Sequence, residues 1–313
     1  MEKIAFIFSG QGAQYPGMGK ELYENLEVCK EVYQKADEAL GIKISKICFE
    51  GPEEELNITE NTQPAILTTS IAAMKALEHN GIKPDITAGL SLGEYSALVC
   101  SGVFDFSDAV KLVKKRGKFM QEAVSPGVGA MAAIIGLKPE ILQEVINASS
   151  IQGIVEAANF NCPGQIVIAG EINAVKFACE RAKEAGAIKA IMLNVSGPFH
   201  TSMLKPAALK LEQELKEMQV NGMEVPVITN VTGELINGSS DIRSILKKQV
   251  MSPVQWEKTI NSMLDFGVDT FIEIGPGKTL CGFVKKVNRK VTALNVENLE
   301  SLNKVLEKLN GGS

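Results

Sequence analysis

The sequence predicts a mixed α/β fold, in which a parallel-sheet core carries an inserted subdomain. Two observations lead to this prediction. Short strand-like runs alternate along most of the chain with longer segments whose apolar residues recur at helical spacing. Between residues 126 and 197 the rhythm changes, because two strand-like runs follow one another without a helix between them. The first pattern favours a parallel sheet covered by helices, and the second favours a separate unit.

The elements of the core follow from the same reading. The strands predicted for it are residues 4–8, 85–89, 226–230, 270–274 and 291–295. The helices predicted for it are residues 20–40, 64–79, 93–100, 107–123 and 299–309. Pro64 suits a first helical turn, where its missing N–H costs nothing, and Gly81 is typical of the stop after a helix.

The insert has the order β-α-β-β-α-β. Its elements are predicted at residues 129–137, 139–148, 154–159, 165–169, 173–184 and 187–195. An Asn-Cys-Pro-Gly turn at residues 161–164 joins the middle strands as a hairpin, which is the order of a ferredoxin-like unit. We therefore expect a discontinuous large α/β subdomain, residues 1–125 and 198–313, and a small subdomain, residues 126–197. A cleft between them is a favourable place for a ligand.

Composition excludes several classes of protein. The 313 residues are 45% apolar and 22% charged with a net charge of −5, which is typical of a globular chain and unsuited to a chain-wide nucleic-acid surface. The longest unbroken apolar run, residues 130–135, is far shorter than the roughly 20 residues of a membrane span. The apolar run at residues 4–8 is too short for a signal-peptide core. Six scattered cysteines and two histidines lack metal-site spacing, so we expect a reduced, cytoplasmic protein without a metal.

A candidate nucleophile lies in the Gly-Leu-Ser-Leu-Gly segment at residues 89–93. The pattern Gly-x-Ser-x-Gly falls where a predicted strand ends and a helix begins, as in a hydrolase-like nucleophile elbow. The alternative is a glycine-rich turn with an incidental serine. A nucleophilic Ser91 needs a base, and only His79 and His200 are available. His79 ends a helix, where it suits the helix dipole. We favour His200, in the hinge between subdomains, over its alternative of a surface loop histidine.

The predicted helix at residues 107–123 has two faces of different character. Arg116 occupies a position of the apolar stripe, so it should point inward, toward either a structural carboxylate or an acidic substrate; the two readings are equally favoured. Four lysines decorate the other sides: Lys111, Lys114, Lys115 and Lys118. These lysines are either a solvated face or a docking surface for an acidic partner.

Two glycine-rich turns suggest nucleotide binding, but both fall short of the known fingerprints. In the segment after the first strand, Tyr15 stands where a dinucleotide motif requires its third glycine. Before Lys278, Ile272 stands where a P-loop requires its first glycine. Both are better interpreted as backbone turns at strand ends, although a non-catalytic nucleotide-binding module stays an alternative.

With these residues assembled, the whole chain resembles the malonyl-CoA:acyl carrier protein transacylases of fatty-acid synthesis and the related acyltransferase domains of polyketide synthases. The motifs that carry the resemblance are FSGQGAQ (residues 8–14), PGMG (16–19), NTQPA (61–65), GLSLGEY (89–95), RG with MQ (116–121), NFN with PGQ (159–165), GPFH (197–200), PVQW (253–256) and EIGPG (273–277). One departure is Leu90, where the family usually has histidine.

The resemblance implies a mechanism and roles for particular residues. Ser91 would take the malonyl group from coenzyme A as an ester, and the carrier-protein thiol would then remove it. His200 would move the protons, and the backbone carbonyl of Gln249 would orient its ring. The other residues implied are the backbone N–H groups of Gln11 and Leu92 for the oxyanion, Arg116 for the malonyl carboxylate, Gln63 to shape the site, and Met120 and Phe199 to bound the acyl pocket.

The same resemblance implies two partners, acyl carrier protein and malonyl-CoA, with no cofactor, no nucleic acid and no membrane, and we expect a monomer. A serine hydrolase would use the same Ser91 and His200 but would not need an inward Arg116, and it would admit water to the acyl-enzyme. Acceptance of the acyl group by a thiol rather than by water separates the two activities.

Overall fold

The computed structural model describes residues 3–195, 197–236, 238 and 241–310, and its core is a parallel sheet. Four strands pair in the order β2-β1-β7-β8, all parallel. They are β1 (Ile4–Phe8), β2 (Ile86–Gly89), β7 (Thr270–Ile274) and β8 (Thr292–Val296). Because the strands run in one direction, the loops after β1, β2 and β7 emerge at the same edge of the sheet, where ligands of α/β proteins collect.

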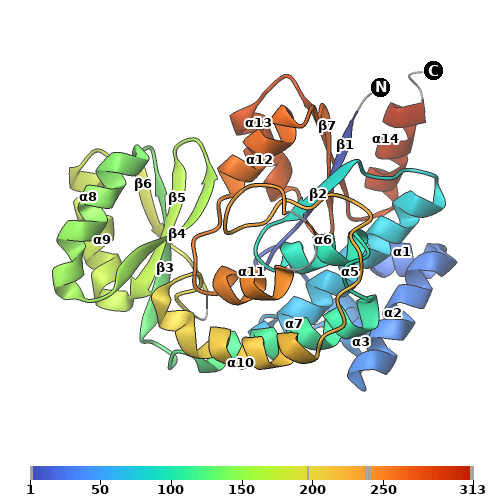
Figure 1. The fold of residues 1–313 in the computed structure, drawn as a ribbon, viewed down its shortest axis with the longest axis horizontal. Helices are drawn as coiled ribbons and strands as arrows, with labels where there is room; N and C mark the ends of the chain where they lie inside the picture. Colours follow the sequence, from blue (N-terminus) through green and yellow to red (C-terminus); the bar gives the residue numbers. More distant parts are fainter. Residues whose placement is uncertain (1–2, 196, 237, 239–240, 311–313) are drawn as a thin grey trace.

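Helices surround this sheet and form the larger of the two subdomains with it (Figure 1). They are α1 (Lys20–Asn25), α2 (Glu27–Leu40), α3 (Ile44–Glu50), α4 (Glu53–Leu56), α5 (Thr59–His79), α6 (Gly93–Cys100), α7 (Phe106–Glu122), α10 (Lys205–Glu217), α11 (Ile242–Gln249), α12 (Trp256–Asp265), α13 (Thr279–Val287) and α14 (Leu299–Asn310). The central helix α5 is buried on nearly all sides and packs against α7 and α2. One large apolar cluster joins most of these helices to the sheet through residues such as Phe6, Phe8 and Ile272, and a second cluster packs α12 and α13 against the sheet through Ala5 and Ile7.

The second sheet is antiparallel and lies to one side of the first (Figure 1). Its strands, in the order β4-β5-β3-β6, are β3 (Gly129–Ile135), β4 (Val155–Cys162), β5 (Gln165–Glu171) and β6 (Lys189–Met192). Helices α8 (Pro139–Ser149) and α9 (Ile172–Glu184) pack on it around their own apolar cluster. The predicted α/β class with a β-α-β-β-α-β insert is confirmed. Residue 196, in the second predicted boundary, lies outside the described residues, and the exact subdomain limits stay a prediction.

Three predicted elements differ in detail. The single helix expected over residues 20–40 is two, because Leu26 is extended between α1 and α2 and the Asn25 side chain donates to the carbonyl of Glu21. Helix α5 begins at Thr59, so Pro64 lies inside it rather than in its first turn. The cost is small, since proline this close to the start leaves only the Glu60 carbonyl without its usual donor. Residues 226–230 form two isolated bridges instead of a strand: Val227 pairs in parallel with Thr87 of β2, and Ile228 pairs antiparallel with Leu235.

Backbone hydrogen bonds join the small sheet to the large subdomain. Phe160 of β4 donates its N–H to the carbonyl of Val254, and Val254 donates to the carbonyl of Ala158. These bonds extend β4 onto the segment that follows α11. The small sheet is therefore anchored beside the edge where β1, β2 and β7 end.

Candidate active site

Ser91 occupies a tight turn between β2 and α6. Its φ is 53°, in the left-handed region that non-glycine residues rarely adopt. Glycines allow the approach of neighbouring chain: a Cβ on Gly93 would collide with the Phe8 carbonyl, and one on Gly10 would lie 2.5 Å from the Leu90 oxygen. The turn after β1 is thus pressed against the serine turn. This is the strained strand-to-helix geometry that exposes a serine hydroxyl at the end of a sheet.

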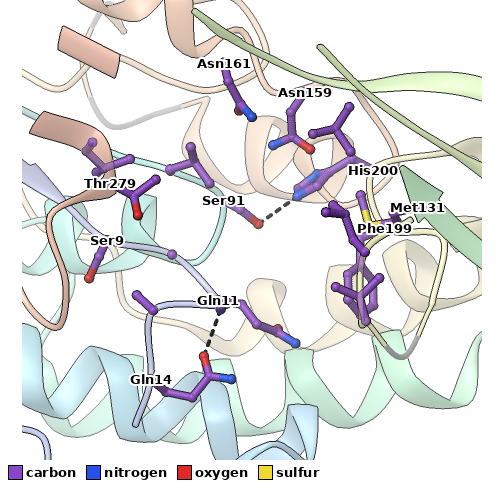
Figure 2. Close-up of a pocket in the computed structure, with 18 of the residues that line it drawn as sticks. Ser9, Gln11, Gln14, Ser91, Met131, Asn159, Asn161, Phe199, His200 and Thr279 are labelled. Carbon is purple, nitrogen blue, oxygen red and sulfur yellow. Dashed lines mark hydrogen bonds between the residues drawn. The ribbon is translucent and has the colours of Figure 1, made fainter. Parts of the chain in front are cut away.

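His200 faces this serine and is held from behind. Its Nε2 lies 2.7 Å from Ser91 Oγ (Figure 2), and its Nδ1 lies 2.9 Å from the backbone oxygen of Gln249. A carbonyl only accepts, so the proton belongs on Nδ1 and Nε2 is left as the acceptor for the serine hydroxyl. The histidine has a φ of 63° and is 3% exposed. Burial, with Arg116 nearby, lowers the pKa of His200 to about 4, so the ring is a neutral base at pH 7.

Arg116 is buried directly behind Ser91, with 1% of its surface exposed. Its Nη1 donates to Gln63 Oε1 at 2.9 Å, and its Nη2 donates to Gln249 Oε1 at 3.0 Å and to Ser91 Oγ at 3.3 Å. Within the described part of the chain its Nε has no partner, and no carboxylate forms an ion pair with it. Burial lowers the pKa of this guanidinium. A buried cation with only neutral hydrogen-bond partners is costly, which favours an anionic ligand over a structural ion pair.

A cavity of about 640 Å³ opens in front of the serine, between the two sheets. Of the predicted residues, Ser91, His200, Gln11, Met120 and Phe199 line it. In Figure 2, Met131 and Phe199 lie on the histidine side and Ser9 and Thr279 on the opposite side. Strand β4 contributes Asn159 and Asn161 to the wall. The cavity therefore takes residues from both sheets, as the sequence predicted for a cleft between subdomains.

Four predicted residues lie behind the cavity wall. Arg116, Gln63, Gln249 and Leu92 are buried and do not line the cavity. Gln63 also donates to Met120 Sδ at 3.5 Å, so the glutamine that holds Arg116 also contacts a residue that lines the cavity. Leu90, the departure from the family pattern, lines the cavity with an apolar side chain. His79 ends α5 and is not among the cavity residues, so His200 is the histidine that the structure pairs with Ser91.

Sequence reasoning missed two polar residues of the site. Asn230 Oδ1 accepts from the Ser91 N–H at 2.6 Å, while its Nδ2 donates to the Gly89 carbonyl at 2.7 Å. The fully buried Glu94 accepts from the Asn230 N–H and from Gln249 Nε2. Asn230 ends the strand-like run beside β2, so its place at the sheet edge was an available signal. Glu94 belongs to the GLSLGEY motif of residues 89–95, which was the available signal for it.

The glycine-rich turns are already occupied by the chain's own side chains. The N–H of Gly12 donates to Gln14 Oε1, that of Gly277 to Glu297 Oε2, and that of Cys281 to Glu273 Oε2. Carboxylates at the turn before α13 take the place that a phosphate would need. The nucleotide-binding alternative thus loses its support.

Two kinds of feature are absent from the described residues. No group of three or more histidine, cysteine, aspartate or glutamate side chains is arranged to hold a metal ion there. In the same part of the chain, none of the helices combines the length and apolar character needed to cross a membrane.

The strained serine, its buried neutral histidine and the cleft between the sheets define the class of this protein, an enzyme that transfers acyl groups. Comparison with known proteins narrows that class. The profile of the acyl transferase domain matches residues 5–306, and the chain belongs to the acyl transferase family.

Named relatives of the chain are similar over their full lengths. The malonyl CoA-acyl carrier protein transacylase of Bacillus subtilis is 51% identical over 310 residues, which are 99% of this chain and 98% of the relative. The crystal structure of the transacylase of that name from Clostridium perfringens is 55% identical, with a TM-score of 0.96 over 99% of this chain and 98% of that one. A malonyl-transacylase solved in complex with a type II polyketide acyl-carrier protein is 41% identical, with a TM-score of 0.95 over 98% and 100%.

Proposed function

We propose that this protein transfers the malonyl group from malonyl-CoA to the phosphopantetheine thiol of acyl carrier protein, for fatty-acid biosynthesis. The reaction is ping-pong and passes through a malonyl ester on Ser91. The names of the relatives support the substrates. The observation that carries the proposal is the buried Arg116 guanidinium beside Ser91 Oγ, without a carboxylate partner of its own in the described chain.

In the first half-reaction, Ser91 Oγ attacks the thioester carbonyl of malonyl-CoA while His200 Nε2 takes the hydroxyl proton. The Gln249 carbonyl, bonded to Nδ1, keeps the ring oriented and supports the imidazolium. The backbone N–H groups of Leu92 and Gln11 receive the negative oxygen that develops on the carbonyl. The carbon–sulfur bond then breaks, and the departing coenzyme A thiolate takes the proton from His200.

The second half-reaction reverses these steps with a different thiol. The phosphopantetheine thiol of the carrier protein gives its proton to His200 and attacks the ester carbonyl. The ester bond breaks, and Ser91 Oγ recovers the proton. Because a thioester is exchanged for a thioester, no oxidation state changes, and we propose that no cofactor takes part.

Specificity for malonyl rests on the distal carboxylate of the acyl group. Arg116 has a donor, Nε, that no described residue uses, and Nη2 already points at Ser91 Oγ. A planar guanidinium grips a carboxylate with two parallel hydrogen bonds. Gln63 steadies Nη1, and Met120 and Phe199 bound the space left for the short acyl chain.

The proposal is tested by single-turnover loading. Incubation with malonyl-CoA should leave one malonyl group on Ser91, found by intact mass and peptide mapping, and the Ser91→Ala variant should carry none. Addition of holo carrier protein should then discharge the ester much faster than buffer does. A malonyl group on a cysteine such as Cys281 would contradict the role of Ser91. Discharge to water as fast as to the thiol would show a hydrolase.

A further inference from the structure

Glu94 is a buried acid that the mechanism above does not use. It lies on the first turn of α6, three residues after the nucleophile, and is fully buried. One carboxylate oxygen, Oε2, accepts from the Asn230 N–H at 3.0 Å and from Gln249 Nε2 at 2.9 Å. The other oxygen has no partner within the described residues. Burying a carboxyl group with one unpartnered oxygen costs stability, which favours a functional role for Glu94.

The contact with Gln249 fixes which way the side-chain amide faces. A carboxylate accepts, so the NH₂ of Gln249 turns toward Glu94 and also reaches the Ser91 carbonyl oxygen at 2.8 Å. The amide oxygen is thereby turned to the opposite side, where it accepts from Arg116 Nη2 at 3.0 Å. Gln249 thus bridges the carboxylate of Glu94 and the guanidinium of Arg116, which do not touch.

The contact with Asn230 reaches the serine turn from the other side. Glu94 holds the backbone N–H of Asn230, and the Asn230 side chain clasps the turn at the Ser91 N–H and the Gly89 carbonyl. One carboxylate oxygen of Glu94 therefore holds both Asn230, which bonds to the serine turn, and Gln249, which bonds to Arg116.

We propose that Glu94 is a positioning residue, which acts through Gln249 and Asn230 to orient the Arg116 guanidinium toward the acyl group on Ser91. The inference rests on the proposed malonyl transfer. Burial raises the pKa of the Glu94 carboxyl to about 7, and its bonds to Gln249 and Asn230 oppose that rise. The role is geometric, since it needs an acceptor oxygen at this place and not a full charge.

The test compares Glu94→Met, which keeps the length but removes the acceptor, with Glu94→Gln, which keeps an oxygen. The readout is the ratio of kcat/KM for malonyl-CoA to that for acetyl-CoA, because acetyl has no carboxylate to present to Arg116. We expect Glu94→Met to lower the ratio about tenfold, within the range measured for residues sharing one hydrogen-bond network. We expect Glu94→Gln to stay within about threefold of the wild type.

A matched control separates positioning from loss of stability. Asp37 also accepts two hydrogen bonds, from Ser45 N and Ser45 Oγ, but it lies on α2 and does not line the cavity. Asp37→Ala should lower the melting temperature and leave the malonyl-to-acetyl ratio unchanged. An unchanged ratio in Glu94→Met, or an equal loss in Glu94→Gln, would overturn the inference.

Gln249→Met supplies a second, independent arm. It removes the amide bridge and keeps the backbone oxygen that orients His200, so it should lower kcat/KM for malonyl-CoA by a larger factor than that for acetyl-CoA. The Glu94→Met/Gln249→Met double variant should lower the ratio no further than the worse single variant, and additive losses would overturn the inference.

Should Glu94→Met fail to fold, Glu94→Asp replaces it, with a partial loss expected. Arg116→Ala is measured alongside: if it keeps the ratio, the substrate role of Arg116 fails, whereas if only Glu94→Met keeps it, this inference alone fails.

Discussion

The two faces of helix α7 carry the same kind of charge in opposite circumstances. On one face Arg116 is buried and bonded to glutamine and serine side chains. On the other, each of four lysines lies within 4 Å of a carboxylate, in the pairs Lys111–Asp108, Lys114–Glu60, Lys115–Glu214 and Lys118–Glu122. The exposed lysines are paired with carboxylates of the chain itself, whereas the buried Arg116 forms no ion pair with a described residue.

This difference bears on the two hypotheses about the helix. Exposed ion pairs contribute about 0–1 kcal/mol each and leave their surface nearly neutral, so the structure favours a solvated lysine face over a docking surface. A buried guanidinium without a carboxylate is stabilised by an incoming anion far more than an exposed lysine would be. We therefore propose that the functional face of α7 is the one with the buried Arg116, which lacks an ion pair, and not the one with the four lysines.

The largest expected effect concerns His200, the histidine that faces Ser91 beside the buried Arg116. His200→Ala should lower the rate of malonyl transfer by several orders of magnitude, because each proton-transfer role contributes about 10²- to 10⁴-fold. The measurement is kcat with malonyl-CoA and holo carrier protein. Arg116 should remain able to bind the carboxylate, so KM for malonyl-CoA should change much less. A near-normal kcat would place the base elsewhere.

A smaller effect follows from the field of Arg116 on His200. The cation opposes protonation of the ring, so its removal should raise the pKa of His200 from about 4 toward, but not up to, its ordinary value, since burial is the larger cause of the shift. Acetyl-CoA loading falls as pH decreases through the pKa of the base, so the acidic limb of kcat/KM should move to higher pH in Arg116→Ala.

That comparison is made in a Glu94→Gln background, which removes a second buried group of the site, whose pKa is raised to about 7. An acidic limb that stays in place would show that the guanidinium does not act on the ring.

The smallest expected effect is on the lysine face. Charge reversal at Lys111 or Lys115 should change KM for carrier protein by less than about twofold, because each lysine is already neutralised by its neighbour. Malonyl loading from coenzyme A serves as the control and should not change. A several-fold rise in KM for carrier protein, lost at high salt, would instead make this face a docking surface.

The sequence carried enough information for the fold, which depends on local patterns, and for the reacting pair, because Ser91 lies in a local motif and the chain has only two histidines. Residues 93–100 and 270–274 were predicted with the bounds of α6 and β7, since glycine breakers and apolar runs delimit them. The inward position of Arg116 followed from helical spacing, and its burial is confirmed. What surrounds Arg116 did not follow: Gln249 is 133 residues away from it in the chain, and no local pattern announces such a contact.

The central claim is that Arg116 is kept without a carboxylate so that it can bind one from the substrate. The most direct measurement is kcat/KM for malonyl-CoA and acetyl-CoA in Arg116→Ala, together with its melting temperature. A buried substrate carboxylate left unpaired should cost about 2–5 kcal/mol, which lowers malonyl loading roughly 30- to 5,000-fold and leaves acetyl loading nearly intact. Arg116→Lys should restore only part of the loss, because an ammonium lacks the planar fork. An unchanged malonyl-to-acetyl ratio with a lowered melting temperature would contradict the claim.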